Sequence, residues 1–406
     1  MHELIRAIEN AHKKPYGGEL EPFGPDGAAR ALGFHRTLPG YTPTPLARLD
    51  GLGAKLGLQS LWVKDESHRL GLKAFKGLGG IYAMARCLGA RLGLSDDAIT
   101  FGALTAPGAA ARLGQATFVA ATDGNHGRGV ALGAKLLGHK AVILMPRGAA
   151  PARLGAIRSF GAEATETDLN YDDTVRLAAQ MADEKGWVLL QDTAWPGYET
   201  IPGWIMEGYA AMVQEAFDAL DETDEAPTHV FIQAGVGSLA AAVQGYLCER
   251  LGEARPKVMV MEPMRADCLY KSMEAGGQAV RVADLDTIMA GLSCGEPSST
   301  ALPTLRDYAD FFIACDDRVA ATGMRILASP LPGDDRVVSG ESGAVGAGLI
   351  YLLGTRPEYA GLRGRMGLNK TARVLLLSTE GDTDPDIYER IVWGGAYPID
   401  GIAASL

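Results

Sequence analysis

The sequence predicts an α/β fold in which open, mostly parallel sheets are covered by helices on both faces. From about residue 100 onward, short apolar segments rich in β-branched residues alternate with longer helical segments. Near-continuous apolar strands separated by helices are typical of parallel sheets that are buried on both faces. The 52 glycines suit many tight strand-to-helix turns, and 406 residues are enough for two domains.

Six strands are predicted from the apolar segments at 116–122, 140–146, 187–191, 229–234, 257–262 and 373–379. Helical segments follow the first three strands, at 129–138, 150–161 and 200–217. A weak change in composition near 186–200 separates one α/β set from the next. Ligands of such sheets bind at the carboxyl ends of strands, beside helix N-termini. The turns that follow the strands are therefore the candidate sites.

Composition argues against several classes of function. The net charge of −11 argues against binding to nucleic acid or to anionic membranes, both of which attract basic surfaces. No apolar segment approaches the roughly 20 residues that a membrane span needs. The start, MHELIRAIENAHKK, has scattered charges and lacks the apolar core of a signal peptide, so the cytoplasm is the expected compartment.

The cysteines, at 87, 248, 268, 294 and 315, show no CxxC spacing, which argues against a zinc site. No metal site is predicted. Disulfides are rare in cytosolic proteins, so we expect reduced, mostly buried thiols. If any pair is bridged, Cys268 and Cys294 are the candidates, because both lie in loop-like segments near candidate site residues.

The segment THVFIQAGVGSLAAAVQGYL (228–247) is typical of a strand, a glycine turn and the start of a helix. Within it, Gly235-x-Gly237-x-x-Ala240 matches the dinucleotide-binding fingerprint. The fingerprint is weak evidence on its own, because a helix N-terminus binds any phosphate. Three interpretations stay open at this point. They are a dinucleotide, with Glu262 near the expected acidic position, another phosphate, and a close strand–helix crossing without a ligand.

Lys76 stands at the start of a predicted helix in VKDESHRLGLKAFKGLGGIYAMA (63–85), between Phe75 and a glycine-rich first turn. The positive end of the helix dipole disfavours a cation there, and apolar surroundings also disfavour the charged form. Both effects bias the side chain toward the neutral amine, which a Schiff base with an aldehyde cofactor requires. The alternative is an exposed lysine that simply begins a helix.

The segment ATDGNHGRGVALG (121–133) again predicts a strand, a turn and a helix. Its turn carries Asp123, Asn125 and His126 together with two glycines, so donors from backbone and side chains converge and predict a ligand-binding loop. A carboxylate beside an anionic ligand would be repelled. Asp123 therefore indicates a cationic substrate group or a proton to be removed. His126 alone would more often be structural.

Two further strand ends carry polar side chains. Asp192 ends an apolar strand, at the edge where parallel sheets place their chemistry, although it could equally cap the following turn. Ser378 and Thr379 end the last predicted strand, where a hydroxyl suits hydrogen bonding to a heterocycle nitrogen. Either hydroxyl could instead cap a turn.

Taken together, these segments resemble the fold type II pyridoxal-phosphate-dependent enzymes, the family of threonine dehydratase, serine dehydratase and tryptophan synthase β. Residues 41–80 are similar to the family's opening, from its TPL segment to the cofactor lysine. DGNHGRG is similar to its asparagine loop, AGVGSLAA to its phosphate loop, and STEGD to the segment whose hydroxyl faces the pyridine nitrogen. The motifs occur in family order over most of the chain. The resemblance implies a two-domain fold type II enzyme with pyridoxal 5′-phosphate as its cofactor.

Within that family, the chain is most similar to the diaminopropionate ammonia-lyases, in KDES, GLKAFK, ATDGNHGRGV, QDTAW, IPGWIMEGY, AGLSCGEPS and STEGDTD. Ordinary dehydratases of the family usually carry a small residue where this chain has Asp123, which favours a diamino substrate. The resemblance implies a carbon–nitrogen lyase of amino-acid catabolism that eliminates ammonia from D- and L-2,3-diaminopropionate and yields pyruvate. The dinucleotide interpretation leaves Lys76, Asp123 and the 378–384 turn without a role, and we reject it.

The resemblance also implies catalytic roles. Lys76 would bind the cofactor covalently and act as the base for the L-isomer. Asp123 would be the base for the D-isomer, and Asp192 would pair with the substrate's ammonium. The residues expected to bind substrate are Thr122, Gly124 and His126.

The cofactor would be held by one set of backbone and side-chain groups. Backbone N–H groups of 235–239 would bind its phosphate, Asn125 its O3′ oxygen, and Ser378 or Thr379 its ring nitrogen, with the sequence slightly favouring Ser378. The full set of expected cofactor contacts is Phe75, Lys76, Asn125, Gly235, Val236, Gly237, Ser238, Leu239, Ser378 and Thr379.

Several alternatives remain beside this interpretation. A serine or threonine dehydratase or a β-replacement synthase would use the same fold and cofactor, and a non-catalytic pyridoxal-phosphate carrier would need no bases. The expected partner is a small amino-acid substrate, with neither nucleic acid nor a membrane, and the family implies a homodimer. We expect a smaller α/β domain at 87–196, inserted between 1–86 and 197–406 of a larger cofactor-binding domain.

Overall fold

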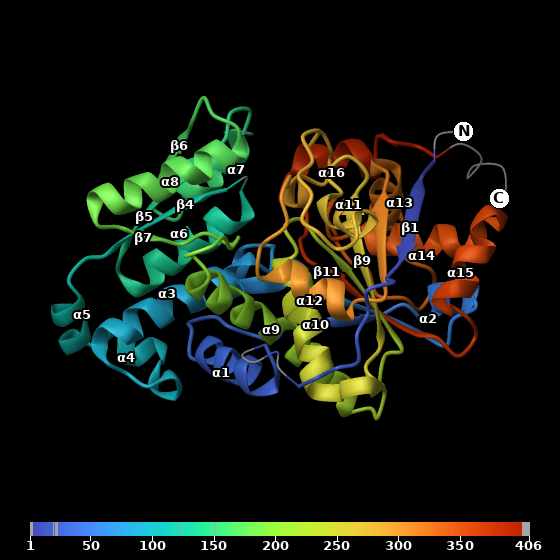
Figure 1. The fold of residues 1–406 in the computed structure, drawn as a ribbon, viewed down its shortest axis with the longest axis horizontal. Helices are drawn as coiled ribbons and strands as arrows, with labels where there is room; N and C mark the ends of the chain where they lie inside the picture. Colours follow the sequence, from blue (N-terminus) through green and yellow to red (C-terminus); the bar gives the residue numbers. More distant parts are fainter. Residues whose placement is uncertain (1–2, 19, 21–22, 123, 150, 400–406) are drawn as a thin grey trace. The chain divides into compact units, whose positions relative to one another are not determined.

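The computed structural model describes residues 3–18, 20, 23–122, 124–149 and 151–399 (Figure 1). Two compact units make up the described chain. Unit 1 draws on Met1–Glu19, Thr44–His68 and Glu215–Leu406, and unit 2 on Leu20–Pro43 and Arg69–Gln214. Each unit contains one mostly or wholly parallel sheet with helices packed against it, which confirms the predicted fold class. No helix of the described residues is both long and apolar enough to cross a membrane.

Unit 1 contains a seven-stranded sheet in the order β1-β10-β9-β8-β11-β3-β2. Its strands are β1 (Ile5–Glu9), β2 (Leu46–Arg48), β3 (Ser60–Asp65), β8 (His229–Gln233), β9 (Lys257–Pro263), β10 (Phe311–Cys315) and β11 (Arg373–Ser378). The edge strands β1 and β2 run antiparallel to their neighbours, and the inner strands are parallel to one another. The carboxyl ends of the neighbours β8 and β11 therefore lie at the same edge of the sheet.

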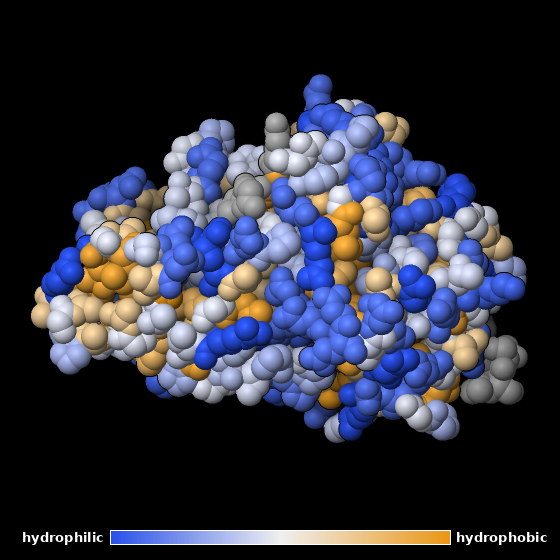
Figure 2. All heavy atoms as spheres, turned by 90° about the horizontal axis from the view of Figure 1, so that it is seen from below, coloured by the Kyte–Doolittle hydropathy of each residue, from blue (hydrophilic) through white to orange (hydrophobic). Residues whose placement is uncertain are grey.

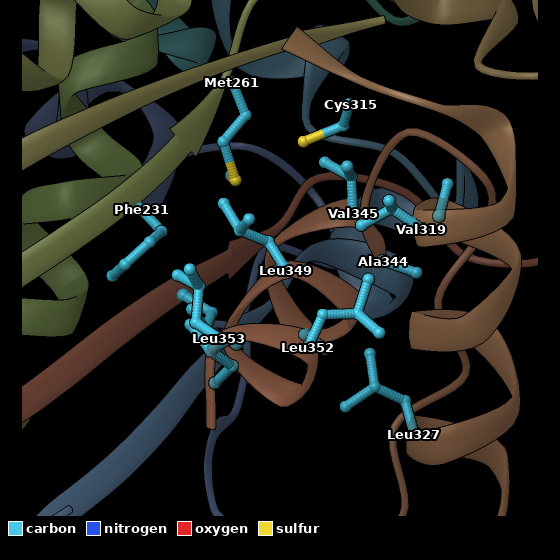
Figure 3. Packing of buried hydrophobic residues seen from close by; sticks show 14 of the residues in the cluster. Phe231, Met261, Cys315, Val319, Leu327, Ala344, Val345, Leu349, Leu352 and Leu353 are labelled. Carbon is cyan, nitrogen blue, oxygen red and sulfur yellow. The ribbon is translucent and has the colours of Figure 1, made fainter. Parts of the chain in front are cut away.

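The helices of unit 1 pack against this sheet over a large apolar core. They are α2 (Asp50–Lys55), α10 (Ser238–Leu251), α11 (Cys268–Glu274), α12 (Ala301–Tyr308), α13 (Asp317–Ala328), α14 (Val345–Thr355), α15 (Ala360–Met366) and α16 (Pro385–Val392). Figure 3 shows Met261 and Cys315 from the sheet close to Val345 and Leu349 of α14. A Cβ at Gly348 of α14 would lie 1.9 Å from the Val319 carbonyl oxygen of α13, so only glycine permits this helix crossing.

Unit 2 contains a four-stranded parallel sheet in the order β6-β5-β4-β7. Its strands are β4 (Thr117–Ala121), β5 (Lys140–Met145), β6 (Glu163–Glu166) and β7 (Val188–Leu189). Its helices are α1 (Pro25–Arg36), α3 (Lys76–Leu92), α4 (Phe101–Thr105), α5 (Pro107–Leu113), α6 (Asn125–Leu137), α7 (Pro151–Arg158) and α8 (Tyr171–Lys185). The long helix α9 (Thr200–Asp221) begins in unit 2 and ends in unit 1.

Close helix crossings in unit 2 depend on glycines of α3. A Cβ on Gly129 of α6 would lie 3.0 Å from the Cα of Gly77, in the first turn of α3. Two residues further along α3, a Cβ on Gly79 would lie 2.8 Å from the Ile205 carbonyl oxygen of α9. Helices α6 and α9 therefore both approach the first turn of α3, which begins at Lys76.

The structure contains all six predicted strands, with ends within two residues of the predicted ones. It adds β1, β2, β3, β6 and β10, which were not predicted, although β10 is a continuous apolar segment. The strands of the four-stranded sheet all fall within 87–196, the limits predicted for a smaller domain. Unit 2 also takes in 20–43 and 69–86, and the predicted limits stay a proposal.

The surface is mixed in character, as expected for a globular protein. Figure 2 shows hydrophilic residues over much of the face that it draws, with smaller hydrophobic areas between them. The five cysteines, all of which the structure describes, are free thiols.

Candidate active site

Lys76 and Asp192 form an ion pair in unit 2. Lys76 is the first residue of α3, and its amine contacts the carboxylate of Asp192, which lies three residues beyond the end of β7. The Asp192 side chain is buried and the Lys76 side chain is 21% exposed. The carboxylate of Asp192 thus compensates the Lys76 ammonium, which the positive end of the helix dipole would otherwise destabilise.

His126 is the second neighbour of Asp192. Its Nδ1 lies 3.8 Å from Asp192 Oδ2, and its Nε2 lies 2.7 Å from the Leu190 carbonyl oxygen, which requires Nε2 to carry the proton. Burial alone would raise the pKa of Asp192, but the charges of His126 and Lys76 lower it to about 2. Asp192 is therefore ionised at neutral pH and provides a buried site for a cation.

The lowered pKa of Asp192 gives a testable pH dependence. Because the pKa of about 2 in the folded state lies below the ordinary value of 3.8, ionised Asp192 stabilises the fold above that value. The contribution, roughly 2 kcal/mol, is lost as the pH falls through the interval between the two values. Urea unfolding of the cofactor-free protein would measure this between about pH 5 and pH 2. Over that interval the free energy of unfolding is expected to fall by roughly 2 kcal/mol more in the wild type than in Asp192→Asn.

The exposed carboxylate of Asp168 supplies the control. Asp168→Asn is expected to follow the wild type over the same pH interval. Parallel curves for the wild type and Asp192→Asn would show that Asp192 gains no stability from its partners.

Two aromatic rings flank the Lys76 amine. The Nζ atom lies 5.3 Å from the centroid of the Phe75 ring and 5.8 Å from that of Tyr209 on α9. The two ring centroids are 4.7 Å apart. Phe75 is a predicted site residue, whereas Tyr209, the last residue of the family-like segment IPGWIMEGY, was given no role from the sequence.

The turn between β4 and α6 holds the next group of predicted residues. The Thr122 hydroxyl accepts hydrogen bonds from the backbone N–H groups of Gly124 and Gly127 at 3.0 and 3.2 Å, so it shapes the start of α6. Gly124 has a φ of +152°, which favours glycine. Asn125 is the first residue of α6. Asp123, the expected base for the D-isomer, lies outside the described residues.

The predicted phosphate loop follows β8 in unit 1. Gly237 precedes α10 with a φ of +98°, and a Cβ there would lie 3.1 Å from a Leu305 methyl carbon, so glycine is required. The first turn of α10, all of which lies within the described residues, contains no acidic residue. Its N-cap residue is Gly237, which has no side chain that could cap the helix. Its N–H groups are therefore suited to an anion.

Glu262, the acidic residue that the dinucleotide interpretation needs, serves a different purpose. Its carboxyl oxygens accept hydrogen bonds from the backbone N–H groups of Leu269 and Tyr270 at 2.8 and 2.7 Å. The side chain is fully buried, and burial raises its pKa well above the ordinary value. A carboxyl group that binds the start of α11 in this way is not free for a ribose.

The hydroxyls of Ser378 and Thr379 have different partners in unit 1. The Thr379 hydroxyl accepts a hydrogen bond of 2.7 Å from the Gln233 side chain of β8. The Ser378 hydroxyl lies 2.8 Å from that of Ser339, in the segment 339–343, which packs against 378–381 so closely that a Cβ at Gly340 would lie 2.4 Å from the Gly381 carbonyl oxygen. Ser339 was not identified as a site residue from the sequence.

The predicted residues thus form one group in each unit. In unit 2 they are Phe75, Lys76, Thr122, Gly124, Asn125, His126 and Asp192. In unit 1 they are Gly235, Val236, Gly237, Ser238, Leu239, Ser378 and Thr379, at the carboxyl ends of β8 and β11. An amine that can form a Schiff base, an uncapped helix N-terminus and a hydroxyl at a strand end fit an aldehyde cofactor with one phosphate and a ring nitrogen.

Comparison with known proteins agrees with this chemistry. A family model described as pyridoxal-phosphate dependent enzyme matches residues 37–361. The chain is 51% identical to the diaminopropionate ammonia-lyase of Salmonella typhimurium, over 97% of this chain and 99% of that relative. It is also similar to the crystal structure of the Escherichia coli diaminopropionate ammonia lyase in complex with D-serine, with a TM-score of 0.91 and 46% identity over 97% of this chain and 98% of that one.

The same Escherichia coli enzyme in complex with an aminoacrylate–PLP azomethine reaction intermediate gives a TM-score of 0.90 and 45% identity, over 98% of this chain and 99% of that one. These identities extend over nearly the whole chain, so they cover both groups of site residues. The chain therefore belongs to the pyridoxal-phosphate-dependent enzymes and, within them, to the diaminopropionate ammonia-lyase family.

Proposed function

We propose that this protein eliminates ammonia from D- and L-2,3-diaminopropionate and yields pyruvate and ammonia. It is a pyridoxal-phosphate-dependent carbon–nitrogen lyase. The observation that carries the proposal is the buried Asp192 carboxylate, which pairs with the amine of the proposed cofactor lysine Lys76 in a chain 51% identical to a diaminopropionate ammonia-lyase. A substrate with two amino groups needs such a carboxylate, because its second ammonium must be bound as well as its first.

Pyridoxal phosphate, when bound, supplies an electron-poor ring that acidifies the Cα proton of an amino acid. Lys76 would hold it through its aldehyde, and the N–H groups of 235–239 would hold its phosphate. Asn125 would bind its O3′ oxygen. Ser378 or Thr379 would bind its ring nitrogen. In this structure the Ser378 hydroxyl donates a hydrogen bond to Ser339, and the Thr379 hydroxyl accepts one from Gln233.

Two bases are needed because the two isomers present their Cα protons on opposite faces. The amine of Lys76 removes the proton of the L-isomer, and Asp123 removes that of the D-isomer. Asp192 accepts hydrogen bonds from the substrate's ammonium, as it does from the Lys76 amine in this structure. Thr122, Gly124 and His126 line the same turn and would complete the substrate site.

The overall reaction balances as one proton transfer and one bond cleavage. The Cα proton goes to the base, and the bond between the β-carbon and its nitrogen breaks with its electron pair on nitrogen, so that ammonia leaves after protonation. Water then converts the unsaturated amino acid into pyruvate and a second ammonia.

The stoichiometry distinguishes this reaction from its rivals. A diaminopropionate lyase is expected to release twice as much ammonia as pyruvate, because both nitrogens of the substrate are lost. A serine or threonine dehydratase would release equal amounts of ammonia and keto acid from its hydroxy substrate, and a β-replacement synthase would release no keto acid. Coupled assays for ammonia and pyruvate on the same sample would measure the ratio, and any ratio near one from diaminopropionate would refute the proposal.

We propose that the protein is a homodimer, as the family resemblance implies, and that it acts in the cytoplasm in amino-acid catabolism. Size-exclusion chromatography with light scattering would test the homodimer.

A further inference from the structure

Tyr209 is a fully buried residue beside Lys76 to which the proposed mechanism gives no role. Its ring centroid lies 5.8 Å from Lys76 Nζ, and its side chain is 0% exposed. Its hydroxyl makes no hydrogen bond of standard geometry within the described part of the chain, although the Lys76 amine is close enough to lower its pKa as a donor. A buried hydroxyl without a partner is unfavourable, so the hydroxyl needs an explanation other than stability.

Two glycines place the Tyr209 ring where it is. A Cβ at Gly79 would lie 2.5 Å from Cε1 of Tyr209, so the ring occupies the space that this glycine leaves open on α3. A Cβ at Gly208, the residue before Tyr209, would lie 2.6 Å from the Leu78 carbonyl oxygen. The backbones of α3 and α9 can approach this closely only because both positions are glycine, and the approach brings Tyr209 to the start of α3.

Lys76 and Asp192 are charged neighbours of Tyr209. Burial raises the pKa of Tyr209, the ammonium of Lys76 lowers it, and the carboxylate of Asp192 raises it further. Tyr209 is therefore a protonated phenol at neutral pH, and it is close enough to feel both members of the ion pair. Its oxygen has lone pairs that can accept an N–H.

We propose that Tyr209 is a positioning residue for Lys76, whose amine donates an N–H to the Tyr209 oxygen while it acts as a base. This inference rests on the proposed function. When Asp192 binds the substrate's ammonium, it no longer holds the Lys76 amine in place. A neutral amine has two N–H bonds and one lone pair, and it is an effective base only when that lone pair faces the Cα proton. A hydrogen bond to Tyr209 would fix this direction.

Tyr209→Phe removes only the hydroxyl and keeps the ring that packs on Phe75 and Gly79. For the L-isomer, kcat is expected to fall about tenfold with little change in KM, the size expected for one lost hydrogen bond. For the D-isomer, whose base is Asp123, the loss is expected to be much smaller. Tyr388→Phe is the matched control, because Tyr388 on α16 is also buried and its hydroxyl also lacks a partner within the described residues.

A second measurement does not depend on turnover. The rate at which the cofactor-free protein captures pyridoxal phosphate, followed by absorbance as a function of pH, reports on the Lys76 amine directly. Tyr209→Phe is expected to slow capture by about the same factor, while its stability to urea equals or exceeds that of the wild type. Tyr388→Phe is expected to capture the cofactor at the wild-type rate.

Three results would overturn the inference. They are equal losses on the two isomers, an unchanged capture rate, and a loss of stability in Tyr209→Phe that Tyr388→Phe does not share. If the wild type fails to turn over either isomer, the proposed function is refuted, and the capture rate still tests Tyr209.

Discussion

Replacement of Lys76 by arginine is expected to reduce turnover of both isomers of 2,3-diaminopropionate by at least about 10³-fold. Arginine keeps the positive charge that pairs with Asp192, so the fold should survive. Its guanidinium cannot lose a proton at working pH, and it therefore serves neither as a Schiff-base nitrogen nor as a base. Steady-state rates of pyruvate release, together with the absorbance of bound cofactor, would measure the effect.

Lys73 provides the matched control for this substitution. It lies three residues before Lys76 and is exposed. Lys73→Arg is expected to retain wild-type turnover and cofactor binding. Substantial turnover by Lys76→Arg would mean that another lysine holds the cofactor, and the assignment of the whole site in unit 2 would fail with it.

Replacement of Asp123 by asparagine is expected to separate the two isomers. The amide cannot accept a proton at neutral pH, so turnover of the D-isomer should fall by about 10²- to 10³-fold. Turnover of the L-isomer, which uses Lys76, should change much less. The measurement is kcat/KM for each isomer with the same enzyme preparation.

Asp168→Asn removes an exposed negative charge from the same unit and should leave the ratio of the two rates unchanged. If Asp123→Asn slows both isomers by the same factor, Asp123 acts in binding or folding and not as the base for one face. A selective loss of the L-isomer would reverse the assignment of the two bases.

Two of the strands that were not predicted, β3 and β6, lack a clear apolar pattern for physical reasons. β3 contains Lys64, which is buried and lies 2.6 Å from a carboxyl oxygen of Glu215, so a charged residue occupies a position that the apolar pattern reserves for hydrophobic side chains. β6 is an edge strand in which only Ala164 is buried, and it therefore has no apolar pattern to recognise. The strands that were predicted are nearly continuous apolar segments, buried on both faces.

Some residues of the candidate site could be predicted from local motifs, and others are brought together only by tertiary packing. Lys76 lies in a contiguous motif at the start of an element, and its residue types and their order predict it without a structure. Tyr209 reaches Lys76 in unit 2, and Ser339 reaches Ser378 in unit 1, through tertiary packing, because Gly79 admits the first and the segment 339–343 positions the second. A tyrosine in an apolar helix or a serine in a turn carries no local signal of such a contact.

The most direct test of the proposed function is the rate of pyruvate release from D- and L-2,3-diaminopropionate, measured beside L-serine and L-threonine at equal concentrations. The proposed function requires diaminopropionate to react fastest, in both isomeric forms. If only the hydroxy amino acids react, the protein is a dehydratase, and the roles given to Asp123 and Asp192 are wrong.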